Sequence, residues 1–197
     1  GLATLGGTQV TSGGAQTYTG NVVMQDSTGT FGFNSTLGGT GATIGFAGTL
    51  TSPTTKALTL NAGTTGDVTL VTALANTATY TDVTVTGANL SLQAIATTNS
   101  LALNPTVAGT VGLISGASST LTKGAAGVMN LTAANTYGGN TTITAGILKL
   151  TGSGSLGAGT YAGNIAISSG AQLQDSSSTA QTLSGIISGA GHVLKDT

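Results

Sequence analysis

The residues of this chain that could act as acids, bases or metal ligands are few and widely separated. The acidic residues are five aspartates, the only histidine is His192, and there is no cysteine or glutamate. Glycoside cleavage needs two carboxyl groups flanking one bond, and a zinc site needs three or four converging ligands. Even the nearest pair, Asp67 and Asp82, is separated by more than a strand length. We therefore interpret His192 as a surface strand residue and the following as solvated turn residues: Asp26, Asp67, Asp82, Asp175 and Asp196.

Motifs for a serine nucleophile or for calcium are missing from the sequence as well. A hydrolase elbow reads Gly-x-Ser-x-Gly between a strand and a helix, whereas the stretch Gly152-Ser153-Gly154-Ser155-Leu156 is typical of a corner. Calcium-binding nonapeptide repeats need Gly-Gly-x-Gly-x-Asp, and the Gly-Gly pairs here lack that aspartate. We expect no catalytic residue, no metal and no cofactor, and we predict that the protein is not an enzyme.

Composition and charge narrow the class of protein further. The 197 residues carry four lysines, no arginine and a net charge of −1, so the basic surface that nucleic-acid binding needs is missing. No run of about 18 apolar residues occurs, and no membrane insertion is expected. A hydrophobic fraction of 39% is enough to fill a core, and the composition does not shift along the chain. We expect a single domain over residues 1–197.

The chain start and the lysines give two smaller expectations. The residues Gly1-Leu2-Ala3-Thr4 include neither an initiator methionine nor a basic segment before an apolar run, which is typical of a processed chain or an excised piece. Lysines on strands protect exposed edges from aggregation. We expect this solubilising role for Lys56, Lys123, Lys149 and Lys195, and in addition a structural role within a repeated unit for Lys123 and Lys195.

Short alternating segments predict an all-β chain. Thr, Gly, Ser, Asn and Val dominate and are poor helix formers, and no stretch keeps a 3.6-residue period. Apolar residues instead stand two apart in short runs bounded by Gly, Asn, Ser or Thr, as in Ala57-Leu58-Thr59-Leu60. Each such run is expected to form a strand with one buried face.

One unit recurs and predicts the architecture. Tyr137-Gly138-Gly139-Asn140 is followed 24 residues later by Tyr161-Ala162-Gly163-Asn164, and an earlier copy is Tyr18-Thr19-Gly20-Asn21. A unit of this size cannot bury its apolar face alone, but it can by stacking on its neighbour. The repeat predicts a parallel β-solenoid of about eight coils. A β-sandwich or an open barrel is second, because either would need more aromatic residues and fewer glycines.

The composition suits stacked coils. Inward Leu, Val and Ile would form columns along the axis, while Thr fills outward strand positions. Gly and Asn would occupy the corners, where positive φ is needed, and stacked Asn side chains can form ladders. With so few charges, we expect stability to be indifferent to salt and pH.

Residues 121–150 carry a more specific pattern. They contain Leu-Thr-Lys, a glycine-spaced apolar segment, Asn-Thr-Tyr-Gly-Gly-Asn-Thr-Thr-Ile and Ala-Gly-Ile-Leu-Lys-Leu. This order resembles the autotransporter-associated β-strand repeat, and residues 16–22 are similar in style to filamentous-haemagglutinin-like bacterial adhesins. The resemblance implies a right-handed parallel β-helix on the outside of a bacterium, without enzymatic activity, that serves as a stalk, adhesin or matrix component.

The two ends of the chain read as halves of one repeat. Val193-Leu194-Lys195-Asp196-Thr197 followed by Gly1-Leu2-Ala3-Thr4-Leu5 parallels residues 121–131, one residue shorter. We therefore predict a split repeat that joins residues 192–197 to residues 1–24. Neither end reads as a polar cap, and an uncapped coil offers unpaired strand edges to another chain. The predicted partner is a second copy in an open-ended filament, stacked head to tail through Leu2, Ala3, Thr4, Leu5, Val193, Leu194 and Lys195.

These observations favour a structural and adhesive protein, located outside the cell or on a bacterial surface. The alternative is a solenoid that binds a glycan or a host receptor on its flank. We expect four aromatic residues to belong to the core rather than to a sugar-binding platform: Phe31, Phe33, Phe46 and Tyr80. Thr-x-Thr pairs such as Thr84/Thr86 and Thr142/Thr144 raise the further possibility of an ice-binding face, but they do not recur at a fixed period.

Overall fold

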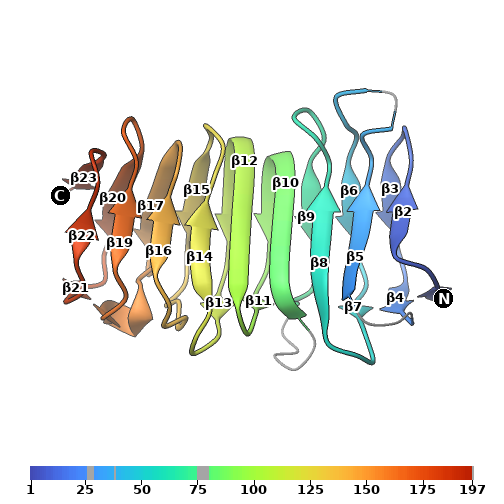
Figure 1. The fold of residues 1–197 in the computed structure, drawn as a ribbon, viewed down its shortest axis with the longest axis horizontal. Helices are drawn as coiled ribbons and strands as arrows, with labels where there is room; N and C mark the ends of the chain where they lie inside the picture. Colours follow the sequence, from blue (N-terminus) through green and yellow to red (C-terminus); the bar gives the residue numbers. More distant parts are fainter. Residues whose placement is uncertain (26–28, 38, 75–79, 197) are drawn as a thin grey trace.

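A computed structural model describes residues 1–25, 29–37, 39–74 and 80–196. The chain is a parallel β-solenoid of about eight turns, with its termini at opposite ends of the long axis (Figure 1). Every strand pair in the described residues is parallel, and the one helical element is the short 3₁₀ turn η1 (Gly157–Gly159). The predicted fold class is confirmed, while the right-handed winding stays a prediction. No helix within the described ranges is long and apolar enough to cross a membrane.

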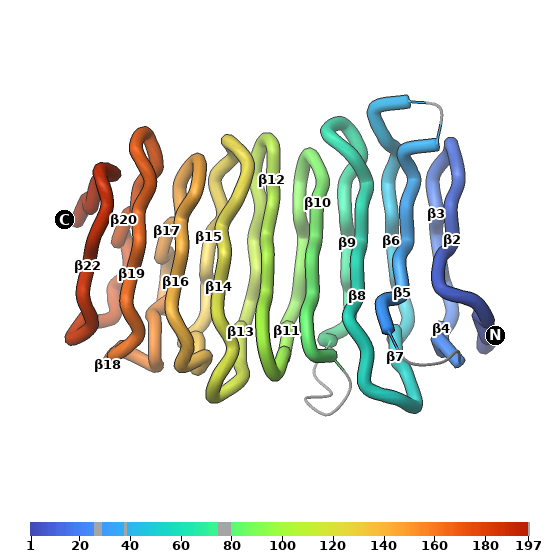
Figure 2. The backbone as a smooth tube through the Cα atoms, viewed as in Figure 1, coloured from blue at the N-terminus to red at the C-terminus, as the bar shows by residue number. Residues whose placement is uncertain are grey.

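Each coil passes through three faces, named here A, B and C. Face A and face B are continuous stacks that run from one end of the solenoid to the other (Figures 1 and 2). Face A contains β2 (Gln9–Thr11), β5 (Gly29–Asn34), β8 (Lys56–Asn61), the first parts of β10 (Tyr80–Leu92) and β12 (Ser100–Val111), β14 (Thr120–Lys123), β16 (Thr141–Ile143), β19 (Ile165–Ile167) and β22 (Ile187–Ser188). Face B contains β3 (Gln16–Tyr18), β6 (Ile44–Phe46), β9 (Val68–Leu70), the second parts of β10 and β12, β15 (Val128–Leu131), β17 (Ile147–Gly152), β20 (Gln172–Ser177) and β23 (His192–Lys195).

Face C is a discontinuous set of short pairs that precede each face A strand. Isolated bridges at Leu74/Ile95 and Ala134/Ser155 supplement these pairs. Its strands are β1 (Leu2–Leu5), β4 (Asn21–Met24), β7 (Leu50–Thr51), β11 (Ile95–Ala96), β13 (Ile114–Ser115), β18 (Thr160–Tyr161) and β21 (Thr182–Leu183). The chain therefore winds in the order C, A, B in successive coils.

Coil length varies along the solenoid. Gly29 opposes Lys56, 27 positions later, whereas Asp82 opposes Ser100, 18 positions later. Part of the difference is absorbed within β10, whose pairing shifts register between Tyr80 and Val83 and between Gly87 and Asn89, and the rest is absorbed in the corners. A single sequence period near 24 therefore describes only the average coil.

The core consists of stacked inward columns. On face A one inward column runs through Phe33, Leu60, Val85 and Leu103, and all four side chains are fully buried. Outward positions between the inward ones carry Thr59, Thr84, Thr122 and Thr142 in one column, interrupted by Ala102. The predicted columns of apolar and β-branched residues are confirmed. Thr84 and Thr142, the first residues of two Thr-x-Thr pairs, thus share an outward column, although the pairs are irregularly spaced along the sequence.

Close backbone approach explains some of the corner glycines. Gly41 has φ of +114°, and a Cβ atom there would lie 1.9 Å from the carbonyl oxygen of Ala62 in the next coil. Gly63 has φ of +71° and would meet Thr40 at 2.0 Å in the same way. Only glycine satisfies both the positive φ and the contact between coils.

The Tyr-x-Gly-Asn units fix one coil on the next. Asn140 Oδ1 accepts a hydrogen bond from the Asn164 N–H at 3.0 Å, and Asn164 Oδ1 accepts one from the Ile186 N–H at 2.9 Å. Both units lead into face A strands, β16 and β19. Asn21 Oδ1 likewise accepts the Thr49 N–H at 3.0 Å, but it opens β4 on face C. The predicted Asn ladder therefore runs from side chain to backbone, and the Tyr18 unit occupies a different phase of the coil.

Candidate self-association interface

The first and last coils each have one strand edge without a partner in the described chain. At the N-terminal end the edge strands are β1, β2 and β3, and at the C-terminal end they are β21, β22 and β23 (Figure 1). Because all the strands run in parallel, every internal strand pairs through one edge with the coil before it and through the other edge with the coil after it. The two ends of the solenoid therefore present these two complementary edges. An unpaired edge offers free N–H and C=O groups to an incoming strand.

At the N-terminal end the predicted segment alternates between inward and outward side chains. Ala3 and Leu5 are partly buried against the core, whereas Leu2 has 66% of its surface exposed and Thr4 is exposed. A hollow of about 310 Å³ lies between Gly1–Ala3 and the stretch from Tyr18 to Val22. The end coil thus combines apolar side chains with a concave surface.

Tyr18 and Gln16 complete this end on face B. The Tyr18 ring stacks on Phe46 with a centroid distance of 4.7 Å and an interplanar angle of 7°, and meets the edge of Phe33 at 5.5 Å. Gln16 is buried and its Nε2 donates to the Asn34 carbonyl at 2.7 Å and to Ser12 Oγ at 3.2 Å. Burial raises the pKa of Tyr18 above its ordinary value.

At the C-terminal end four large apolar side chains are exposed. Val193 is 54% exposed although it lies in the inward column above Leu173, and Leu194 is 43% exposed at an outward position. Ile187 continues the inward column of Ile165 on face A and is 43% exposed, and the adjacent Ile186 is 69% exposed. Inside the solenoid, inward positions of this kind are covered by the next coil.

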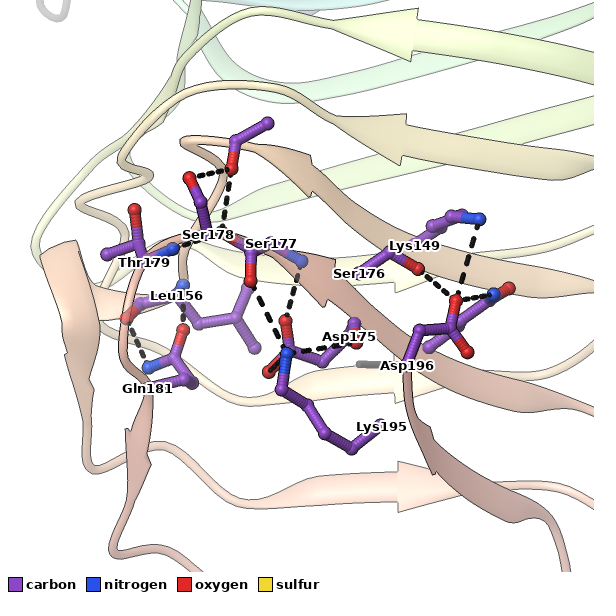
Figure 3. Close-up of polar contacts among 12 residues, drawn as sticks. Lys149, Leu156, Asp175, Ser176, Ser177, Ser178, Thr179, Gln181, Lys195 and Asp196 are labelled. Carbon is purple, nitrogen blue, oxygen red and sulfur yellow. Dashed lines mark hydrogen bonds and ion pairs between the residues drawn. The ribbon is translucent and has the colours of Figure 1, made fainter.

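A polar cluster borders this apolar end (Figure 3). Lys195 Nζ lies 3.6 Å from Asp175 Oδ2 and donates to the carbonyl oxygens of Asp175 and Ser177, each at 3.4 Å. Lys195 stands above Asp175 in an inward column in which Leu150 and Leu131 occupy the two coils before Asp175. The last two coils therefore carry one ion pair at positions where the two preceding coils carry leucine.

Asp196 forms the second half of the cluster. Its Oδ2 accepts hydrogen bonds from Ser176 Oγ and from Gln174 Nε2, and it lies 4.0 Å from Lys149 Nζ (Figure 3). The hydrogen bonds from Ser176 and Gln174 lower the pKa of this carboxyl group below its ordinary value. These contacts tie the outward side of β23 to β20 and β17.

The structure places the predicted stacking residues at opposite ends and on different faces. Leu2, Ala3, Thr4 and Leu5 lie on β1 of face C, whereas Val193, Leu194 and Lys195 lie on β23 of face B. Lys123, which the split repeat equates with Lys195, ends β14 on face A. Further residues of the end coils were not predicted to lie at the stacking edges, namely Val10, Gln16, Tyr18, Leu183 and Ile187. The alternation of apolar and polar residues around them is the sequence signal that could have indicated them.

The lysine prediction is wrong for two of the four residues. Lys56 and Lys123 are 3% and 0% exposed, because both take inward positions of face A. Lys123 Nζ donates to the carbonyl oxygens of Gly124, Ala125 and Ala145 at 2.6, 3.0 and 2.9 Å. Burial lowers the pKa of Lys123 to about 8, since desolvation disfavours its charged form.

The aspartates are less solvated than the sequence suggests. Asp82 and Asp175 lie within strands β10 and β20 rather than in turns. Asp67 accepts hydrogen bonds from the backbone and side chain of Asn89 at 3.0 and 2.9 Å, and Asp82 accepts one from Asn99 at 2.6 Å. The prediction of turn residues is therefore wrong for Asp82 and Asp175, and Asp26 lies outside the described residues. His192 is confirmed as an exposed strand residue.

The aromatic side chains belong to the interior. Phe31, Phe33, Phe46 and Tyr80 are at most 1% exposed, which confirms the prediction that they belong to the core. Tyr137 and Tyr161 meet edge to face at 5.5 Å, and the Thr141 hydroxyl lies 2.7 Å from the hydroxyl oxygen of each. No three His, Cys, Asp or Glu side chains gather at one place in the part of the chain that the structure describes.

Comparison with known proteins adds no relative: no family model, no curated protein and no solved structure matches this chain. The resemblance of residues 121–150 to the autotransporter-associated repeat therefore stays a prediction based on the motif.

Proposed function

We propose that this protein is a non-enzymatic structural and adhesive element of a bacterial cell surface or extracellular matrix, and that its solenoid is extended by stacking end to end on further copies. The observation that carries the proposal is the pair of terminal coils. Each keeps an unpaired strand edge, and each exposes apolar side chains at positions that the core elsewhere covers.

Physical complementarity supports a second copy as the partner. The two ends present opposite edges of the same parallel stack, so strand direction and face order match without rearrangement. The first 24 residues include no charged side chain, so the N-terminal end does not repel the charges at the C-terminal end. Covering the exposed Ile187, Val193 and Leu194 would contribute roughly 25 cal/mol for each Å² removed from water.

The alternative, a ligand site on the flank, has weaker support. Protein sites for sugars commonly offer an exposed aromatic ring, and among the Phe and Tyr rings of the described residues only Tyr18 is not fully buried, with one face of its ring stacked on Phe46. The outward columns of face A instead carry small hydroxyl and methyl groups such as Thr59, Thr84 and Ala102. Stacking accounts for more of the unusual exposure than flank binding does.

Replacing Val193 tests the proposal. Val193→Asp places a carboxylate on the C-terminal stacking surface and is expected to abolish assembly, seen as a shift to monomer in analytical ultracentrifugation and as the loss of filaments in negative-stain microscopy. Val107→Asp is the matched control, because Val107 is 60% exposed in the middle of β12, away from both ends. Circular dichroism checks that both variants keep their β structure. Equal assembly of both variants, or a wild-type chain that stays monomeric at high concentration, would contradict the proposal.

A further inference from the structure

The order of faces at the two termini determines how one copy can follow another. Each coil runs from face C through face A to face B, the described chain begins with β1 on face C, and it finishes with β23 on face B. A second copy on the C-terminal end would therefore begin face C where the first has just completed face B. Its β1, β2 and β3 would then lie on β21, β22 and β23, as the strands of any internal coil do.

Column continuity then selects one register on face B. One inward column runs from Gln16 through Ile44 and Leu148 to Val193, and the other runs from Tyr18 through Phe46 and Leu150 to Asp175 and Lys195. The outward column between them starts at Thr17 and ends at Leu194. If the two copies were displaced by one residue along the strands, the outward Thr17 would align with an inward column. The only registers that keep inward and outward positions aligned are therefore the one without displacement and those displaced by two residues.

We infer, on the basis of the proposed function, that copies stack so that each face B column continues into its own first residue. Thr17 of the second copy then lies directly opposite Leu194 of the first, and the Lys195–Asp175 ion pair of the first copy is enclosed beneath the Tyr18 ring of the second. This assigns a partner and a defined contact to the polar cluster of Figure 3.

The Tyr18 ring suits this position. One face of the ring is stacked on Phe46. Because Tyr18 is the first residue of its column, the opposite face of the ring points to the open N-terminal end of the solenoid. A lysine ammonium over an aromatic face is attracted by the ring quadrupole, and more strongly when water is excluded. A shift by two residues would bring Lys195 against Gln16, whose Nε2 already donates to Asn34 and Ser12 and whose Oε1 already accepts a hydrogen bond from the Tyr18 hydroxyl at 3.4 Å.

The solenoid already holds a fully enclosed lysine elsewhere. Lys123 occupies an inward column position, is 0% exposed, and satisfies its ammonium with three carbonyl oxygens of its own corner and of the next coil. Lys195 makes the same kind of contacts with the carbonyl oxygens of Asp175 and Ser177, and has a carboxylate in addition. Enclosing Lys195 is therefore compatible with the way this fold treats an inward lysine.

Cysteine pairs test the register, because the chain has no cysteine of its own. Chains with Thr17→Cys and chains with Leu194→Cys are mixed under mild oxidation. Directly opposite positions on parallel strands lie about 4.8 Å apart, within the Cα range of a disulfide, so this pair is expected to cross-link. The control pair, Thr19→Cys with Leu194→Cys, would be separated by about 8 Å in the same register and is expected to remain reduced.

The outcomes separate the register from the proposed function. Cross-linking of the control pair, or filaments in which neither pair cross-links, would overturn the register while leaving end-to-end stacking in place. An absence of both cross-links and filaments would overturn the proposed function as well.

The ion pair gives a second, independent readout. Lys195→Met leaves the Asp175 carboxylate without its cation where stacking encloses it, and the protein concentration needed for assembly is expected to rise by about tenfold or more. The double variant Lys195→Met with Asp175→Leu makes the column apolar and is expected to restore assembly. Lys123→Met is the matched control, because Lys123 is an enclosed inward lysine on β14, away from both ends of the solenoid. Unchanged assembly of Lys195→Met would show that the ion pair is not enclosed.

Discussion

The buried Lys123 makes the stability of this solenoid depend on pH in a range where few other groups titrate. Its pKa falls from an ordinary 10.5 to about 8 because its ammonium is desolvated. Between these values the unfolded chain holds a proton on Lys123 that the folded chain has lost. Since the unfolded state binds more protons, the free energy of unfolding must rise as the pH rises through this range.

The size of the effect follows from the two pKa values. Burial of the charged form lowers stability near pH 7 by about 3 kcal/mol relative to an unshifted lysine, and about half of that is recovered between roughly pH 8 and 9.5. Replacing Lys123 with methionine removes the titrating group and leaves the tyrosines unchanged. The difference in unfolding free energy between wild type and Lys123→Met should therefore change by about 1.5 kcal/mol across that interval.

Urea denaturation followed by circular dichroism at several pH values between roughly 8 and 9.5 measures this difference. Lys149→Met, which replaces a lysine with 27% of its side chain exposed, is the control for the general effect of a lysine-to-methionine change. A difference between wild type and Lys123→Met that stays constant over the interval would refute the reasoning, since it would mean that folding does not disfavour the charged form of Lys123.

Three further predictions concern the stability of single coils. Gly41→Ala should lower the free energy of unfolding by about 2–3 kcal/mol in urea melts, because φ at Gly41 is +114° and the new Cβ atom would collide with Ala62. The control is Gly14→Ala, whose Cβ atom would meet nothing within 4 Å and which should leave the free energy of unfolding unchanged. Tyr161→Phe should cost about 1–2 kcal/mol in the same assay by removing the hydroxyl that contacts Thr141 at 2.7 Å, and an unchanged value would contradict a stabilising role for that contact. Stability should fall as the pH rises above about 10, because burial raises the pKa of all four tyrosines, Tyr18, Tyr80, Tyr137 and Tyr161, which ionise normally once unfolded. An alkaline melt that shows no such fall would contradict this prediction.

The sequence was sufficient for the architecture because two local signals agree. Alternating apolar runs such as Leu58 and Leu60 indicate half-buried strands, and the Tyr-x-Gly-Asn copies at Tyr137 and Tyr161 indicate stacked repeats. Both copies lead into face A strands and bond to the next coil through Asn140 and Asn164. Local pattern and global fold therefore agree over this part of the chain.

The remaining features depend on coil phase, which the sequence pattern does not show. The Tyr18 unit leads from face B into face C, whereas the Tyr137 and Tyr161 units lead into face A, and Lys123 and Lys195 lie on different faces, although their local sequences look alike. For the same reason an inward lysine cannot be told from an outward one until the strands are aligned. The burial of Lys123 and of the tyrosines, which the sequence pattern does not show, is the reason why stability is now predicted to depend on pH on the alkaline side.

Cryo-electron microscopy of the concentrated wild-type chain would show whether parallel coils continue from one copy into the next along one axis. We expect filaments whose strands lie perpendicular to the filament axis at about 4.8 Å spacing, with no break in face A or face B where one copy meets the next. Isolated particles with blunt ends, or a density map with antiparallel hairpins, would contradict it.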